Sequence, residues 1–134
     1  MRIKAVIDTN ILVSALLSSN AEAATVKVFK MLFKGNLVPI ISDEIILEYN
    51  DVLHREKFSF PEESISSLLE EIIRKAIRII PCHADITLPD EKDKQFFDAM
   101  LSDDEAVLIT GNMKHFPEHE RIMTARKFID SYGQ

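Results

Sequence analysis

Short apolar runs alternate with longer amphipathic stretches along the chain. Runs at 3–7, 37–41 and 106–109, each followed by turn or helix-capping residues, predict buried strands. Shorter runs at 78–80 and 121–123 predict two further strands. Apolar residues at helical spacing between and after them predict helices, at about 11–17, 21–34, 43–55, 62–77, 93–101 and 125–132.

Strands that alternate with helices need crossover connections, which predict a mostly parallel sheet. We expect a three-layer α/β/α fold with a central sheet of four to five strands. The chain has neither a repeat nor a linker, so we expect residues 1–134 to form a single domain. Ligands of such sheets bind beyond the carboxyl ends of the strands. This rule selects Asp8, Ser42 and Asn112, which each follow a predicted strand.

The composition is that of an ordinary globular protein, with 46% hydrophobic and 28% charged residues. It excludes the disordered, collagen-like and disulfide-framework classes. The single cysteine, Cys82, cannot form an intramolecular disulfide, and no apolar run approaches the roughly 20 residues of a membrane span. The start of the chain lacks the apolar stretch of a signal peptide. We therefore expect a cytoplasmic protein with no membrane partner.

The net charge of −6, from 16 basic and 22 acidic residues, argues against nucleic-acid binding through the overall field. A polyanionic substrate would need a local reversal of the potential, and divalent cations supply one where carboxylates gather. Lys27, Lys30 and Lys34 share one face of the second predicted helix. We interpret them as a solvated surface rather than as an RNA contact.

Two acidic residues stand out in the first half of the chain. Asp8 directly follows the first predicted strand, where its carboxylate can face solvent at the sheet edge. A helix-capping role is the alternative, but Asn10 is available as the cap. On the third predicted helix, at ~100° per residue, Glu48 lies nearest the apolar arc, whereas Glu44 and Asp51 point further out and are expected to be solvated.

A third acidic residue, Asp93, projects into the apolar side of the fifth predicted helix, which Phe96 and Phe97 help to define. A carboxylate rarely faces inward without a partner. Capping of the helix or interaction with its dipole is the alternative. Asp98 points away from this side, and we expect it to be solvated.

The predicted topology can bring Asp8, Glu48 and Asp93 to one edge of the sheet. Three carboxylates at close quarters repel one another unless they are protonated or compensated, and the usual compensation is a hard cation such as Mg²⁺ or Mn²⁺. Two such ions ~3.5–4 Å apart could clamp the attacking and leaving oxygens of a phosphodiester. The acidic residues therefore indicate metal-assisted chemistry on a phosphate.

Taken together, four segments in this order resemble the PIN domain family over nearly the whole chain. They are Ile7-Asp8-Thr9-Asn10, Ser42 followed by Glu48-Tyr49, Asp93 with Phe96-Phe97, and Val107-Leu108-Ile109-Thr110-Gly111-Asn112. The resemblance implies a Mg²⁺- or Mn²⁺-dependent ribonuclease, often the toxin of a toxin–antitoxin pair and often a homodimer. It therefore implies an RNA substrate, an antitoxin protein and a second copy of the chain as partners.

The resemblance also implies roles for individual residues. Asp8, Glu48 and Asp93 are implied as catalytic metal-binding acids. The residues implied to support the site are Thr9, Asn10, Ser42 and Thr110.

Asn112 departs from the family pattern, because many members have an acidic residue after the last central strand. An amide can offer a carbonyl oxygen to a metal but supplies no charge, so we include Asn112 among the metal ligands and expect weakened activity. Lys114 and His115 follow it in the same loop and are candidates for contact with RNA phosphates.

Two other functions stay open at this point. Asn112 raises the alternative of a catalytically degenerate module that keeps the fold and binds RNA or protein without cleaving it. The other alternative is a phosphatase with Asp8 as nucleophile, although Asn10 stands where that chemistry usually has a second Asp.

Overall fold

The computed structural model describes residues 2–133, in which five strands form one sheet in the order β3-β2-β1-β4-β5. All the pairings between these strands are parallel. The strands are β1 (Ile3–Ile7), β2 (Leu37–Ile41), β3 (Ile77–Arg78), β4 (Val107–Ile109) and β5 (Ile122–Met123). The helices are α1 (Thr9–Leu17), α2 (Ala24–Lys34), α3 (Asp43–Leu53), α4 (Glu62–Lys75), α5 (Lys94–Leu101) and α6 (Ala125–Tyr132). Short 3₁₀ turns are η1 (Glu56–Phe58), η2 (Glu91–Asp93) and η3 (Met113–His115).

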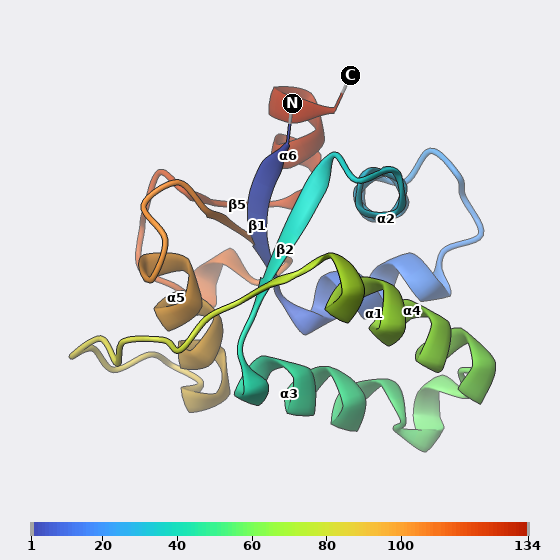
Figure 1. Cartoon of the computed structure of the whole chain (residues 1–134), viewed down its shortest axis with the longest axis horizontal. Coiled ribbons are helices and arrows are strands. Elements are labelled where there is room, and N and C mark those ends of the chain that lie inside the picture. The colour runs from blue at the N-terminus through green and yellow to red at the C-terminus, as the bar shows by residue number, and fades with distance from the viewer. Residues whose placement is uncertain (1, 134) are drawn as a thin grey trace.

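Helices cover both faces of the sheet. Figure 1 shows α5 on one side of the strands and α2 and α4 on the other, with α3 beyond the carboxyl end of β2. Helix α5 packs against β1, β2 and β4, and α2 packs against β2, α1 and α6. The predicted three-layer α/β/α fold with a parallel central sheet is therefore confirmed.

The central strands lie in the middle of the core. Ala5, Val6 and Ile7 of β1 are at most 1% exposed, although successive side chains of a strand point to opposite faces. Burial on both faces is typical of a parallel strand between two layers of helices. The end of β1 is therefore packed on both faces, and this packing positions the residue that follows it.

Several boundaries differ from the prediction. The third strand is Ile77–Arg78 rather than 78–80, and a 3₁₀ turn precedes the fifth helix, which begins at Lys94. Helix α1 begins at Thr9, so Asn10 lies inside the helix and the prediction that it serves as the cap is wrong. Over residues 2–133, no helix has the length and apolar character that crossing a membrane requires.

Candidate active site

Asp8 follows β1 at the carboxyl-end edge of the sheet. Its backbone N–H donates to the carbonyl of Ile109 at 2.9 Å, which fixes it beside the end of β4. Its side chain is buried and accepts a hydrogen bond from Thr110 Oγ1 at 2.8 Å, and Asn10 Nδ2 lies 3.4 Å from the same oxygen. Asp8 occupies the N-cap position of α1, but its side chain makes no capping hydrogen bond. The helix therefore does not use this carboxylate.

Burial makes the charged form of Asp8 unfavourable. The pKa of Asp8 is raised from 3.8 to about 6, chiefly by burial; the hydrogen bond from Thr110 opposes this shift, and the nearby charge of Asp93 adds to it. Near pH 7 the carboxylate is mostly ionised, in a place where the ionised form is poorly solvated. A cation bound at this position would relieve that cost.

Asp93 lies where the turn η2 passes into α5. It is 9% exposed, and although it occupies the N-cap position of α5, its side chain makes no capping hydrogen bond. Its oxygen Oδ2 is hydrogen-bonded to His115 Nδ1 at 2.9 Å. Burial raises the pKa of Asp93, and the hydrogen bond with His115 opposes this shift. The capping alternative is therefore excluded for Asp93 in favour of a pairing with the loop that follows β4.

Glu48 lies on the third helix, α3, and is half-buried. Burial raises the pKa of Glu48, while the positive charges of Lys92 and Arg55 lower it. Within residues 2–133 its carboxylate makes neither a hydrogen bond nor an ion pair. It is thus free to accept a ligand from the solvent side.

Asp93 interacts electrostatically with each of the other two predicted acids. The charge of Asp93 raises the pKa of Asp8 and also that of Glu48, so all three groups share one electrostatic neighbourhood. Even so, no group of three or more His, Cys, Asp or Glu side chains in residues 2–133 is arranged to hold a metal ion. Within these residues the three acids therefore do not form a closed set of metal ligands.

The loop after β4 connects Asp8 to the rest of this edge. Thr110 Oγ1 donates to Asp8 and accepts a hydrogen bond from the backbone N–H of Asn112 at 3.0 Å. The backbone N–H of Gly111 donates to Asn10 Oδ1 at 3.0 Å. A Cβ atom at Gly111 would lie 3.3 Å from the same Asn10 oxygen, so a side chain there would press on this contact. The loop reaches His115 in η3 and therefore ties Asp8 to Asp93.

Thr9 supplies a second observation at the site. Its Oγ1 is the one buried side-chain oxygen or nitrogen without a hydrogen-bond partner in the part of the chain that the structure describes. An unpaired buried hydroxyl is costly, and such groups often mark a place where water or an ion belongs. Thr9 adjoins Asp8 in the chain, and carboxylate and hydroxyl oxygens are the kind of donor that Mg²⁺ or Mn²⁺ prefers.

The remaining predicted site residues have different surroundings. Ser42 is buried, and its Oγ accepts a hydrogen bond from the backbone N–H of Ile45 at 3.2 Å, so it is the N-cap of α3. The side chains of Asn112 and Lys114 are exposed. His115 is only half-buried, and one of its ring nitrogens is engaged by the carboxylate of Asp93.

The prediction that Asp98 is solvated is wrong, because its side chain is 4% exposed. Asp98 pairs with Lys94 at 3.1 Å and accepts a hydrogen bond from the backbone N–H of Ala84 at 3.0 Å. The cause is that α5 is buried nearly all round, with residues 96–100 all inaccessible. The apolar residues on either side of Asp98 were the signal of such a helix.

Tyr49 supports the site through a hydrogen bond that the apolar pattern of the sequence did not predict. Its ring belongs to the buried arc of α3, and its hydroxyl donates to the carbonyl of Ile7, the residue before Asp8. A tyrosine on a buried arc usually needs a partner for its hydroxyl, and this requirement was the available signal. Tyr49 joins α3, which carries Glu48, to the end of β1.

Comparison with known protein families gives one match over most of the chain. A family model described as PIN domain matches residues 4–114. The match begins in β1 and ends in η3, and so it includes the three carboxylates and the loop after β4. No curated protein matches the chain.

Proposed function

The chain belongs to the PIN domain family, and from this membership we propose that it is a metal-dependent ribonuclease. Members of this family are generally nucleases that use divalent metal ions. The proposed reaction is the hydrolysis of RNA phosphodiester bonds. Asp8 carries the proposal. It is a buried carboxylate at the carboxyl end of β1, with a pKa raised to about 6 by burial and by the charge of Asp93. This is the surrounding expected of a carboxylate that binds a cation.

In the proposed mechanism, Asp8, Glu48 and Asp93 would hold Mg²⁺ or Mn²⁺, and Asn112 would add an uncharged oxygen. The bound ion would supply charge for the phosphate and lower the pKa of a water molecule. Thr110 orients Asp8 through its hydrogen bond, and Asn10 fixes the loop at Gly111. Lys114, exposed in the loop, and His115 contact the RNA phosphates.

Cleavage of RNA with and without divalent ions tests this function. We expect cleavage in Mg²⁺ or Mn²⁺, no cleavage with a chelator, and a loss of at least roughly a hundredfold in Asp8→Asn, as for other residues that stabilise charge in a reaction. Asp104→Asn is the matched control, because Asp104 is exposed in the loop before β4, at the opposite edge of the sheet. Full activity of Asp8→Asn, or an equal loss in both variants, would overturn the proposal.

A catalytically degenerate RNA-binding or protein-binding module is the second candidate function. Asn112 favours it, because the amide brings no charge to the site, and so does the open arrangement of the acids in residues 2–133. RNA binding that needs no metal, with no cleavage in any divalent ion, would favour this module over the ribonuclease.

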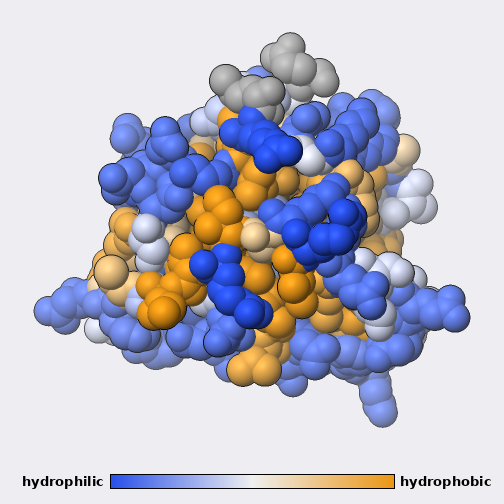
Figure 2. All heavy atoms as spheres, in the orientation of Figure 1, coloured by the Kyte–Doolittle hydropathy of each residue, from blue (hydrophilic) through white to orange (hydrophobic). Residues whose placement is uncertain are grey.

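We also propose that the protein is the cytoplasmic toxin of a toxin–antitoxin pair and acts as a homodimer. Figure 2 shows apolar side chains gathered on the face that β3 crosses. Ile73 on α4, Ile77 in β3 and Ile80 just after β3 are 45%, 40% and 96% exposed, and β3 pairs only with β2 among the described strands. Induced synthesis in a bacterial host should stop growth for the wild type and not for Asp8→Asn. Growth arrest by both proteins would contradict the toxin role.

A further inference from the structure

Two hollows are lined in part by residues of both α2 and α6. The first, of about 380 Å³, adjoins the candidate active site, and we call it the site hollow. Thr25 in the first turn of α2 and Arg126 in the first turn of α6 line it, together with three residues of the site edge, Asn10, Thr110 and Asn112.

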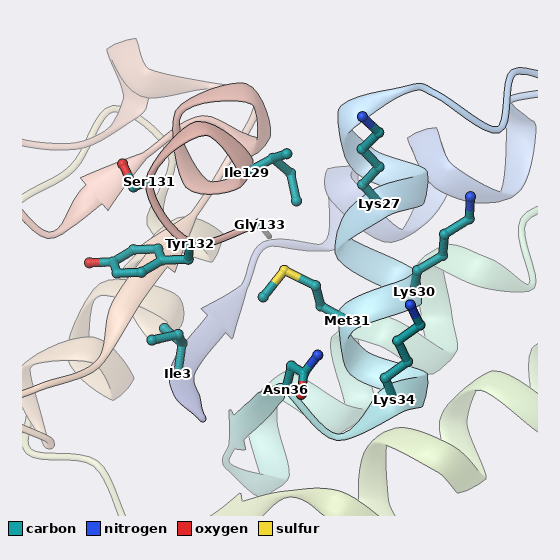
Figure 3. Close-up of a pocket in the computed structure, with 10 residues that line it drawn as sticks. All are labelled: Ile3, Lys27, Lys30, Met31, Lys34, Asn36, Ile129, Ser131, Tyr132 and Gly133. Carbon is teal, nitrogen blue, oxygen red and sulfur yellow. The ribbon is translucent and has the colours of Figure 1, made fainter. Parts of the chain in front are cut away.

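The second hollow, of about 720 Å³, lies further along the same two helices, and we call it the lysine hollow. Figure 3 shows Lys27, Lys30 and Lys34 projecting from α2, with Met31 and Ile129 turned toward the space between α2 and α6. The three lysines are solvent-accessible, as the sequence suggested, but they border a concave surface rather than a plain one.

The two hollows follow one another along α2 and α6 because these helices run in the same direction, and we call the two together the path. Helix α6 follows β5 and therefore starts at the carboxyl-end edge, whereas α2 leads into β2 and therefore ends at the opposite edge. On α2 the lining passes from Thr25 to Lys34, a rise of roughly 14 Å at ~1.5 Å per residue. This length accommodates more than one phosphate of an extended strand.

The charge of this path is opposite to that of the whole protein. Lys27, Lys30, Lys34 and Arg126 line it, and neither Asp nor Glu is among the lining residues of the two hollows in residues 2–133. The chain as a whole has a net charge of −6. A local excess of cations beside an acidic site is an electrostatic footprint typical of nucleic-acid binding.

The partners that these cations already have are weak. Lys27 pairs with Glu22 at 3.4 Å, and Arg126 pairs with Asp130 at 3.8 Å, where both acids are largely exposed. Exposed ion pairs contribute little to stability, so a phosphate can replace them at small cost. Lys34 makes no ion pair within the described residues.

We propose that single-stranded RNA binds along the site hollow and the lysine hollow, with its phosphates on the α2 lysines and Arg126, and so reaches the edge that carries Asp8. The inference rests on the proposed ribonuclease function, because that function requires the RNA strand to reach Asp8. Apolar side chains such as Met31 and Ile129 favour an unpaired strand, whose bases are free to contact protein side chains. The bases of a duplex are stacked inside the helix and cannot contact these side chains.

Binding of a fluorescent oligouridylate in the presence of a chelator tests the path, because no cleavage then interferes. The variant replaces Lys27, Lys30 and Lys34 with Gln, a good helix former on exposed positions. Each phosphate contact contributes about 0.7 to the slope of log affinity against log salt for a single strand, so three lost contacts should reduce the slope by about 2. We expect the affinity at low salt to fall by roughly tenfold or more.

The matched control replaces three basic residues outside the two hollows, Lys57, Arg74 and Arg78, with Gln and so removes the same charge. It should leave the slope unchanged. An unchanged slope in the α2 variant, or an equal reduction in the control, would overturn the path. The path would also be overturned if the α2 variant bound oligouridylate as well as the wild type does but no longer bound oligoglutamate. That result would assign the surface to an acidic protein segment.

Cleavage assays separate this inference from the proposed function. In Mn²⁺ the α2 variant should raise KM and leave kcat nearly unchanged, because the lysines lie away from the carboxylates. If the wild type cleaves no RNA, the ribonuclease proposal fails, yet the binding experiment with the chelator still decides whether the path exists.

Discussion

At the scale of single residues, the burial of Asp8 has a cost that a substitution can measure. The pKa of Asp8 is 3.8 in the unfolded chain and about 6 in the folded protein, so the folded state binds more protons between these values. The contribution of Asp8 to the free energy of unfolding is therefore complete below about pH 4 and is lost as the pH rises through 6. Above that window the ionised form costs the apoprotein roughly 2–3 kcal/mol.

Asp8→Asn should remove this cost, because Asn cannot ionise and its carbonyl can still accept the hydrogen bond from Thr110. We expect a higher free energy of unfolding than that of the wild type at pH 7.5, and a similar one at pH 4, in urea titrations without divalent ions. A variant that is less stable than the wild type at both pH values would contradict the assignment of the pKa.

Thr9 allows a second test at this scale. Replacing its unpaired Oγ1 with the methyl group of Thr9→Val keeps the volume and removes a buried polar atom without a partner. We expect the apoprotein to be as stable as the wild type or more stable, by about 1 kcal/mol, and the affinity for Mn²⁺ in calorimetric titration to fall. A large loss of stability without any change in Mn²⁺ affinity would mean that the hydroxyl is structural.

At the scale of elements, the hydroxyl of Tyr49 joins α3 to the end of β1. Tyr49→Phe leaves the buried carbonyl of Ile7 without this donor, and we expect a loss of about 1–3 kcal/mol in the free energy of unfolding. Tyr132→Phe is the control, because the hydroxyl of Tyr132 makes no hydrogen bond within residues 2–133. Equal effects of the two substitutions in urea unfolding would contradict the role of Tyr49.

The elements themselves were largely predictable from the sequence. Apolar runs of β-branched and aliphatic residues identified β1, β2 and β4 because these strands are buried on both faces. Strand β3 was predicted at 78–80 instead of 77–78 because both its residues are exposed and leave no apolar pattern. Asp98 was misassigned because a helix that is buried all round has no polar face on which to place it.

At the scale of the whole molecule, parallel topology explains why Asp8 could be placed at the carboxyl-end edge of the sheet from sequence alone. The carboxyl ends of parallel strands meet at the same edge. The bond between His115 and Asp93, and the path between α2 and α6, could not be predicted. Both depend on how segments that are far apart in the sequence pack together, which no local pattern encodes.

The exposed isoleucines near β3 make a prediction about assembly. Ile80 is 96% exposed, so Ile80→Lys should not disturb the fold, but it should weaken a dimer that buries this surface. We expect a dimer for the wild type and a monomer for the variant in sedimentation equilibrium. Leu17→Lys, at a position that is 60% exposed on α1, should remain dimeric. A monomeric wild type would contradict the homodimer.

The segment 79–90, which has neither helix nor strand, separates the candidate site residues into two groups along the chain. Asp8 and Glu48 precede it, whereas Asp93, Thr110 and His115 follow it. Cutting the chain at the exposed Thr87 would yield two pieces, each with an incomplete set of acids. Activity regained on mixing them would report the reassembly of the halves, so the protein offers a natural design for a split reporter.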